Sequence, residues 1–238
     1  MGSLYSEFAP YYEQIFPFRE DVYTFLRRFS GHSGERVLDM GCGPGHYCGR
    51  FYDDGFIAEG VDLDPRMIEA ASLRYPGVLF RCLDLAGPAV FVGRFRMIYS
   101  VGNVLAHIQP STLPALLDRV HTALVPGGYW IFQVVNWDYL LTLTTYTFPE
   151  KKIEGGDVSF FRSYPVISDG RAVFYVRLVA AGRTVFEESA TLYPTTSDTY
   201  SNLHEQYGFI SAGIYAGFDG SVYSKVKNSG LVMVFRKN

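Results

Sequence analysis

The stretch Arg36-Val-Leu-Asp-Met-Gly-Cys-Gly-Pro-Gly-His46 decides how this chain folds. Its first half is a short apolar run with one acid inside it, which is typical of a buried parallel strand. The alternating glycines end the run abruptly. A glycine can turn the backbone with positive φ and let a ligand approach closely, because it has no Cβ. Residues 46–54 can then begin a helix whose free N–H groups point into the loop.

The spacing of the glycines distinguishes two classes of ligand. Dinucleotide-binding loops follow G-x-G-x-x-G. Here His46 stands where that pattern has its third glycine. The order Asp-x-Gly-x-Gly-x-Gly instead resembles motif I of the class I S-adenosylmethionine-dependent methyltransferases. The resemblance implies that the following residues hold the amino-acid part of S-adenosylmethionine: Asp39, Gly41, Cys42, Gly43 and Gly45.

Composition and charge argue against several other classes of protein. The chain has 238 residues, of which 48% are apolar, enough for one large domain or one domain with an insertion. A net charge of −3 argues against nucleic acid as a partner. The cysteines are odd in number and lack C-x-x-C spacing, which predicts neither a disulfide framework nor a metal site. With neither a long apolar run nor a leader, we expect a cytoplasmic protein that does not enter membranes.

An acid also follows the second predicted strand, residues 56–62. Asp62 lies at the distance from the glycine loop at which an acid reaches the ribose hydroxyls of a bound nucleotide. An acid at a strand end is otherwise usually a helix cap, but Asp64-Pro65 supplies a cap and a first-turn proline of its own. We therefore assign Asp62 to the ribose of the cofactor.

The adenine ring would lie near the third predicted strand, residues 78–83. In the methyltransferase family an acid after this strand meets the adenine amino group and its neighbour contacts the ring, which implies these roles for Asp84 and Leu85. The alternative for Asp84 is a turn before Gly87-Pro88. The resemblance also places two residues beyond Asp62 at the cofactor, Leu63 and Met67.

The loop after the fourth predicted strand, Gly102-Asn-Val-Leu-Ala-His-Ile108, is polar where the strand is apolar. It resembles the G-N-S-x-A-H loop of glycine N-methyltransferase and its bacterial relatives. The resemblance implies that Val101 and His107 line the cofactor and that Asn103 faces the methyl acceptor. Val104 replaces the family serine. For His107 two roles stay open, a catalytic base or a structural hydrogen bond.

Two further segments add candidate residues. The run Asn136-Trp-Asp-Tyr-Leu-Leu141 resembles the N-Y-D-x-I-L run that follows the fifth strand in the same branch, which implies that Asn136 lies near the acceptor. Residues 4–17 are aromatic and broken by prolines, and they resemble the tyrosine-bearing lid of small-molecule methyltransferases. The resemblance implies that Tyr5, Tyr11 or Tyr12 covers a ligand, and we assign Tyr12 to the cofactor. The alternative is that the stretch only pads the core.

The whole pattern predicts a Rossmann-like α/β fold, a seven-stranded mostly parallel sheet with an inserted antiparallel sheet. Residues 1–150 and 195–238 would form the S-adenosylmethionine-binding domain and residues 151–194 the insert, whose β-rich runs are joined by hairpin signals at Gly170 and Gly182. The insert is either a substrate lid or the interface of a homodimer. Within it, Arg162 either clamps an acceptor carboxylate or is a solvated edge residue.

The function that follows is methyl transfer from S-adenosylmethionine to a small-molecule acceptor, an amine nitrogen, by in-line displacement. Two alternatives remain open. One is an NAD-dependent oxidoreductase, which the missing third glycine disfavours, and the other is a non-catalytic scaffold that keeps the fold. Methyl transfer to nitrogen requires no metal, and we expect none here.

Overall fold

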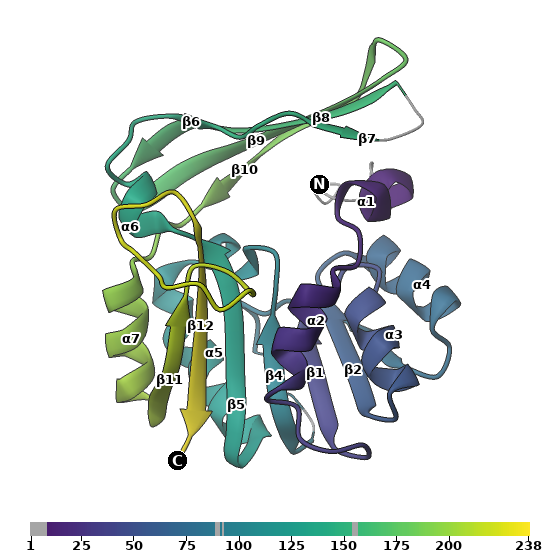
Figure 1. The fold of residues 1–238 in the computed structure, drawn as a ribbon, viewed down its shortest axis with the longest axis vertical. Helices are drawn as coiled ribbons and strands as arrows, with labels where there is room; N and C mark the ends of the chain where they lie inside the picture. Colours follow the sequence, from purple (N-terminus) through teal and green to yellow (C-terminus); the bar gives the residue numbers. More distant parts are fainter. Residues whose placement is uncertain (1–8, 89–90, 92, 154–156) are drawn as a thin grey trace.

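The computed structural model of the protein describes residues 9–88, 91, 93–153 and 157–238, and it contains two β-sheets (Figure 1). The first sheet has seven strands in the order β11-β12-β5-β4-β1-β2-β3. Only β12 runs against the others. The predicted seven-stranded, mostly parallel sheet is therefore confirmed. Its strands are β1 (Arg36–Met40), β2 (Ile57–Asp62), β3 (Leu79–Cys82), β4 (Phe95–Ser100), β5 (Leu124–Val135), β11 (Phe209–Tyr215) and β12 (Gly230–Lys237).

Helices cover both faces of the first sheet, so its central strands are apolar on both sides. Successive residues of a strand point to opposite faces, and Val37 and Leu38 accordingly belong to different hydrophobic clusters. One cluster packs under α2 (Glu20–Arg27) and α3 (His46–Asp53), next to α4 (Pro65–Arg74). The other packs under α5 (Leu113–Ala123) and α7 (Ser197–Gln206).

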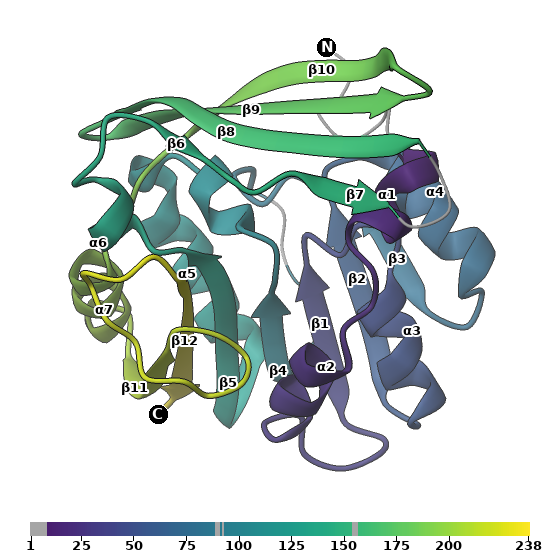
Figure 2. The same ribbon diagram turned by 45° about the horizontal axis from the view of Figure 1, so that its top comes forward.

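The second sheet is antiparallel and lies across the carboxyl ends of the parallel strands (Figure 2). It begins at Tyr146 rather than at residue 151, because β6 pairs with β8. The hairpin turns predicted at Gly170 and Gly182 are confirmed, each glycine having positive φ. Its strands are β6 (Tyr146–Thr147), β7 (Lys151–Ile153), β8 (Val158–Ser168), β9 (Arg171–Ala180) and β10 (Arg183–Leu192).

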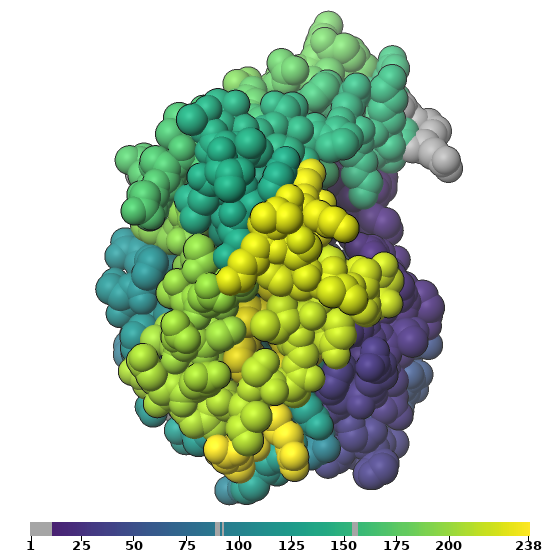
Figure 3. Space-filling model, turned by 60° about the vertical axis from the view of Figure 1, so that its left-hand side comes forward, coloured from purple at the N-terminus to yellow at the C-terminus, as the bar shows by residue number. Residues whose placement is uncertain are grey.

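Short elements connect the two sheets. Helix α1 (Ala9–Ile15) lies under β7, and α6 (Trp137–Leu140) leads from β5 into the second sheet (Figures 1 and 2). The loop between β11 and β12 reaches the second sheet through Asn228, whose Nδ2 donates a hydrogen bond to Tyr146 Oη at 2.6 Å. Figure 3 shows this yellow segment lying against the teal strands of the second sheet.

Among the described residues, no helix is long and apolar enough to cross a membrane. No three side chains of histidine, cysteine, aspartate or glutamate there gather so that they could hold a metal ion. The three cysteines are free thiols.

His204 couples the stability of the fold to pH. Its ring is 1% exposed, Nε2 accepts a hydrogen bond from Trp130 Nε1 at 3.0 Å, and Nδ1 lies 2.6 Å from Tyr200 O. The neutral ring with its proton on Nδ1 satisfies both contacts. Burial lowers the pKa of His204 to about 3. Because this folded-state pKa lies below the ordinary value near 6.5, the unfolded chain binds the extra proton first, and stability falls as pH drops from 6.5 towards 3.

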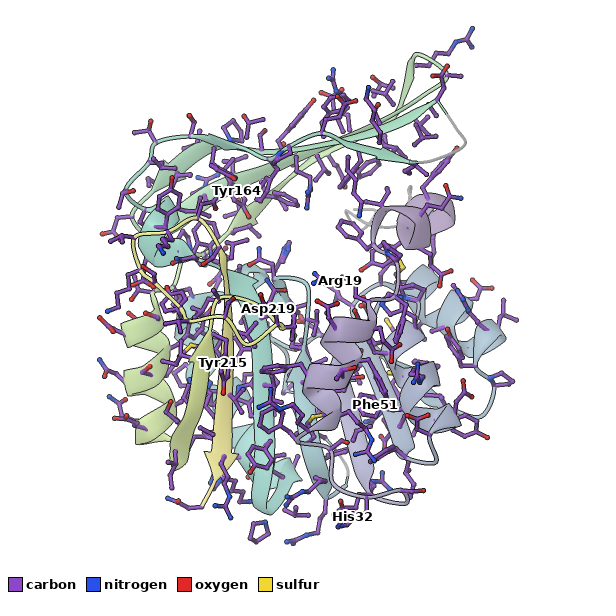
Figure 4. All side chains as sticks on the ribbon, viewed as in Figure 1. Arg19, His32, Phe51, Tyr164, Tyr215 and Asp219 are labelled. Atoms are coloured by element: carbon purple, nitrogen blue, oxygen red, sulfur yellow. The ribbon has the colours of Figure 1, made fainter. Side chains whose placement is uncertain are left out.

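We expect His204 to reduce the free energy of unfolding by about 2 kcal/mol between pH 7 and pH 5. Urea unfolding of the wild type and of His204→Gln at the two pH values measures this contribution as the difference between their losses. His32→Gln is the control, because His32 is exposed at the opposite end of the molecule from the second sheet (Figure 4). Equal losses in the wild type and His204→Gln would contradict the assignment.

Candidate active site

The candidate site lies where the carboxyl ends of the parallel strands face the second sheet (Figures 1 and 2). Parallel strands deliver their following loops to one edge of a sheet, so segments remote in sequence meet there. The glycine loop follows β1, Asp62 ends β2, and the Asn103 loop follows β4. Helix α1 closes the edge from the side and contacts β7.

The glycine loop has the backbone that its sequence predicts. Gly41, Gly43 and Gly45 have φ values of 85°, 51° and 80°, which residues with a Cβ rarely adopt. The amide of Gly41 donates a hydrogen bond to Val61 O at 2.8 Å and so fixes the loop to β2. Helix α3 begins at His46 without a side-chain cap, which leaves amide groups of its first turn available to a ligand.

Asp62 has a structural role in addition to the predicted one. Its Oδ2 accepts a hydrogen bond from Gly43 N at 2.8 Å, and its Oδ1 accepts one from Asp64 N at 2.9 Å. Asp64 caps α4 by accepting from Arg66 N at 2.9 Å, as predicted. The sequence-based assignment assumed that, with Asp64 as the cap, Asp62 has no structural hydrogen bonds, and this assumption was wrong. Each Asp62 oxygen keeps acceptor capacity, and the half-buried side chain can still receive hydroxyl groups.

Asp39 is a buried acid beneath the glycine loop. It is 3% exposed and lies in register with Gly60 of β2 and Tyr99 of β4. Burial, with the nearby charge of Asp62, raises the pKa of Asp39 to about 8. A cationic group placed beside it would favour the ionised carboxylate, so Asp39 fits the ammonium end of the predicted cofactor. Cys42 in the same loop is also buried.

The residues assigned to adenine, Asp84 and Leu85, and the further cofactor candidates Leu63 and Met67 differ in exposure. Leu63 is 63% exposed just after β2, an apolar side chain at the edge of the site, whereas Met67 is 2% exposed and Leu85 8% exposed. Asp84 is exposed and its Oδ1 accepts a hydrogen bond from Ala86 N at 2.8 Å, so it does make the turn that was the alternative. The turn uses one oxygen only, and the adenine contacts stay predictions.

The Asn103 loop is held by β5. Asn103 adopts positive φ, 68°, and its Oδ1 accepts a hydrogen bond from Val135 N at 3.1 Å. Gln133 of β5 accepts from Gly102 N at 2.9 Å through its side chain and from Asn103 N at 3.1 Å through its carbonyl. Sequence reasoning missed Gln133, which only strand pairing brings to this loop. Because Asn103 Oδ1 accepts from Val135 N, its Nδ2 is the group that could donate a hydrogen bond to a methyl acceptor.

His107 and Val101 both lie on the Asn103 loop, as the resemblance implies. Val101 is half-buried and packs on the cluster under α2 and α3. His107 ends the 3₁₀ turn η1 (Val104–His107), and burial lowers its pKa to about 4. A ring with this pKa is neutral at pH 7 and is a weak base, since effective general bases have a pKa near the working pH. These properties favour a positioning role for His107 over proton abstraction.

Tyr12 of α1 lies over the glycine loop. A Cβ added to Gly43 would be 3.3 Å from Tyr12 Oη, so the tyrosine side chain packs onto the glycine backbone. The lid is tied to the second sheet, because Ile15 is fully buried in a cluster with Phe160 and its carbonyl accepts a hydrogen bond from Lys151 Nζ. Tyr11 packs on the same cluster, and Tyr5 lies outside the described residues.

Asn136 does not point to an acceptor. It is 1% exposed, and its Nδ2 donates hydrogen bonds to Ser224 O at 2.9 Å and Lys227 O at 2.8 Å. Its Oδ1 accepts from Tyr223 Oη at 2.7 Å and from Tyr139 N at 3.2 Å. All the hydrogen-bonding capacity of the amide is therefore used within the chain. The structure contradicts the acceptor role implied for Asn136. The Asn136 side chain instead fixes the loop between β11 and β12 by hydrogen bonds.

Arg162 lies on the second sheet, as predicted, and half-buried on its β8 strand. Its guanidinium stacks over the Phe148 ring, with Cζ 4.8 Å from the ring centroid.

Sequence reasoning missed Glu188 on β10 as a candidate residue. The alternation of residues along β10 could have identified it. Phe186 and Leu192 are buried, and Glu188 is an acid on the same face of the strand.

Comparisons with known proteins agree with this geometry. A family model described as a methyltransferase domain matches residues 12–209. The ubiquinone biosynthesis O-methyltransferase of Chromobacterium violaceum is 33% identical over 139 residues, covering 55% of this chain and 56% of that protein. The phosphoethanolamine N-methyltransferase 1 of Triticum aestivum is 26% identical over 206 residues, covering 77% of this chain and 40% of that protein.

The chain spans about half the length of the first of these curated relatives. Solved structures match over nearly the whole chain. The CcbJ methyltransferase from Streptomyces caelestis has a TM-score of 0.81 at 14% identity, covering 99% of this chain and 98% of that one. At this identity the similarity establishes the fold, including the second sheet above the parallel strands.

Proposed function

Since this chain belongs to the family of S-adenosylmethionine-dependent methyltransferases, we propose that it methylates a small-molecule amine. The observation that carries the proposal is the meeting of three features at one edge of the first sheet. These are the positive-φ glycine loop, the acid Asp62 bracing it, and the Asn103 loop beside it. The second sheet and α1 cover this edge and would exclude water from it.

The residues present fit the cofactor. The bare backbone of the glycine loop lies close to the Asn103 loop and the lid, because a Cβ on Gly41 would lie 2.5 Å from Val104 and one on Gly43 would lie 3.3 Å from Tyr12 Oη. Buried Asp39 suits the ammonium group, and Asp62 suits the ribose hydroxyls. When bound, S-adenosylmethionine supplies a methyl group already activated by its sulfonium.

The chain itself mainly has to orient the acceptor. Holding two reactants in line can supply about 7–11 kcal/mol of the barrier without an acid or base. Gln133 and Val135 hold the Asn103 loop, and that loop contacts the glycine loop through Val104. Asn103 Nδ2 is thereby set at a fixed position beside the cofactor-binding loop, where it can donate a hydrogen bond to the acceptor.

The amine is favoured over an oxygen acceptor by the G-N-V-L-A-H loop, which resembles that of glycine N-methyltransferase. The curated relatives include three O-methyltransferases and an N-methyltransferase, so they leave both atoms open. The weakly basic His107 also suits an amine, which needs less help to lose its proton after attack than a hydroxyl needs before it.

Two measurements test the proposal. Calorimetric titration with S-adenosylmethionine and with NADH separates the methyltransferase from an oxidoreductase, and we expect binding of S-adenosylmethionine only. Incubation with a metabolite extract should then release S-adenosylhomocysteine, with the methyl group recovered on nitrogen. Cofactor binding without any release would favour the non-catalytic scaffold, and recovery of the methyl group on oxygen would contradict the amine.

Asn103→Asp should separate acceptor binding from cofactor binding. The aspartate keeps the oxygen that accepts from Val135 N and tolerates positive φ, but it lacks the Nδ2 donor. We expect the S-adenosylmethionine dissociation constant to change less than twofold and turnover at subsaturating acceptor to fall at least tenfold, about 1.4 kcal/mol. Asn202→Asp, on the exposed side of α7, is the matched control. Equal turnover of the two variants would exclude Asn103 from the acceptor site.

A further inference from the structure

The second sheet presents one face to the active-site edge. On β8, alternate residues Phe160, Arg162 and Tyr164 share this face. Phe160 packs in a cluster with Ile15 of the lid, and the Tyr164 ring lies 5.3 Å from the Trp137 ring of α6. The sheet is thus anchored to the rest of the chain on both sides of Arg162, which shares this face with Phe160 and Tyr164.

The strand register places an acid on the same face. Arg162 of β8 lies opposite Val176 of β9, and Val176 lies opposite Glu188 of β10. Val176 is 1% exposed and packs in the same cluster as Ile15 of the lid. The row of Arg162, Val176 and Glu188 therefore lies on the face of the sheet that contacts the lid. Two strand spacings of roughly 4.8 Å separate β8 from β10, so the backbones at Arg162 and Glu188 are about 10 Å apart.

Each of the two charged side chains has a buried atom without a hydrogen bond among the described residues. These atoms are Arg162 Nε, a feature shared by the Nε of five other arginines including Arg177, and Glu188 Oε2, the one such carboxylate oxygen there. A buried polar atom without a partner is costly, and the cost rises for a charged group. The guanidinium is also held in one plane by stacking on Phe148. Such a pair of orphaned groups on one face indicates a ligand that satisfies both.

The charges around this row differ in sign from one end to the other. Lys151 of β7 lies on the Arg162 side, and the pKa of Lys151 is lowered by burial and further by the positive charge of Arg162. Arg19, at the start of α2, adds to the same field (Figure 4). The β10 side carries Glu188. The row is therefore positive at one end and negative at the other.

We propose that Arg162 and Glu188 bind opposite ends of the methyl acceptor and select an amino carboxylate. This inference rests on the proposed function and names its substrate class. The two terminal nitrogens of Arg162 form a planar fork that matches a carboxylate. Glu188 accepts hydrogen bonds from the amino end of the acceptor.

The experiment compares paired variants on the two faces of the same strands. Arg162→Met and Glu188→Gln remove the charges of the inner row with little change in size. Arg177→Met and Glu187→Gln are the controls, since Arg177 and Glu187 are opposite each other on the same β9 and β10 strands and face the other way. The full chain is assayed for S-adenosylhomocysteine release with amino carboxylates, with matched amines that lack the carboxylate, and with matched carboxylates that lack the amine.

We expect turnover of the wild type with amino carboxylates only. Arg162→Met and Glu188→Gln should each reduce it at least tenfold at subsaturating acceptor, while the controls and the calorimetric affinity for S-adenosylmethionine stay within twofold. Equal turnover of amines lacking the carboxylate would overturn the inference and leave the proposed function standing. Loss of activity together with a dimer-to-monomer shift in Arg162→Met would also overturn it, in favour of an interface. Failure of every acceptor class to release product would instead refute the proposed function.

Discussion

Replacing Gly41 by alanine is expected to reduce S-adenosylmethionine affinity at least tenfold. Gly41 has a φ of 85°, and a Cβ there would lie 2.5 Å from Val104 Cγ2. The substitution therefore combines backbone strain of about 1–2 kcal/mol with overpacking that typically costs about 1–3 kcal/mol. The loop can relieve the overlap only by moving away from the Asn103 loop, and a misplacement of about 1 Å can reduce catalysis about a hundredfold.

Gly170→Ala isolates the backbone strain from the overlap. Gly170 has a φ of 74°, but no atom lies within 4 Å of an added Cβ at this hairpin. We expect it to lower the melting temperature by roughly 2–8 °C and to leave calorimetric binding unchanged. The double variant Gly41→Ala/Val104→Ala removes the overlapping methyl groups and should recover part of the lost affinity. Affinity in Gly41→Ala within fivefold of the wild type would contradict a ligand at this loop.

Asp62→Ala is expected to weaken S-adenosylmethionine binding by two to four orders of magnitude. Two charge-assisted hydrogen bonds to the ribose would be lost, each worth roughly 1.5–3 kcal/mol. The variant also leaves Gly43 N and Asp64 N without their acceptor, so the glycine loop loses its brace. Calorimetry measures the affinity, and a loss of less than fivefold would refute the ribose assignment.

Asp62→Asn distinguishes the two roles of this side chain. Asparagine keeps the size of the side chain and one acceptor oxygen but removes the charge and one of the two hydrogen bonds that brace the loop. Its melting temperature should therefore lie between those of Asp62→Ala and the wild type, while affinity still falls at least tenfold. Asp118→Ala, on the exposed face of α5, controls for the loss of a negative charge. If Asp62→Asn binds the cofactor as tightly as Asp118→Ala does, the carboxylate serves the loop and not the ligand.

The contacts of Asp62 separate what the local sequence pattern predicts from what only the tertiary structure determines. An acid after a short apolar strand, at a set distance from a glycine loop, is visible in the sequence. The two hydrogen bonds that make the same carboxylate a brace are not, because Gly43 comes within 2.8 Å of it only once β1 and β2 pair. Asp64 was identified as a cap from sequence because capping is local, acting on Arg66 N two residues away.

The resemblance was right about the family and the fold and wrong about Asn136. The N-x-D run does follow β5, but the loop between β11 and β12 folds back over it and takes three of the four hydrogen bonds of the Asn136 amide, the fourth coming from Tyr139 N. That loop lies more than eighty residues further along the chain. A motif match records neighbours in sequence, so it carries no information about a segment that arrives from so far away.

The sequence alone determined the strand-glycine-helix unit, the run of parallel strands ending in acids, and the change to antiparallel hairpins after the fifth strand. Each of these follows from short-range periodicity and from the conformational freedom of glycine. The tertiary structure decided that Tyr12 covers Gly43, that Asn136 is buried, and that Arg162 and Glu188 lie in one row. These depend on strand register and on packing between remote segments, and a register is set only when whole strands pair.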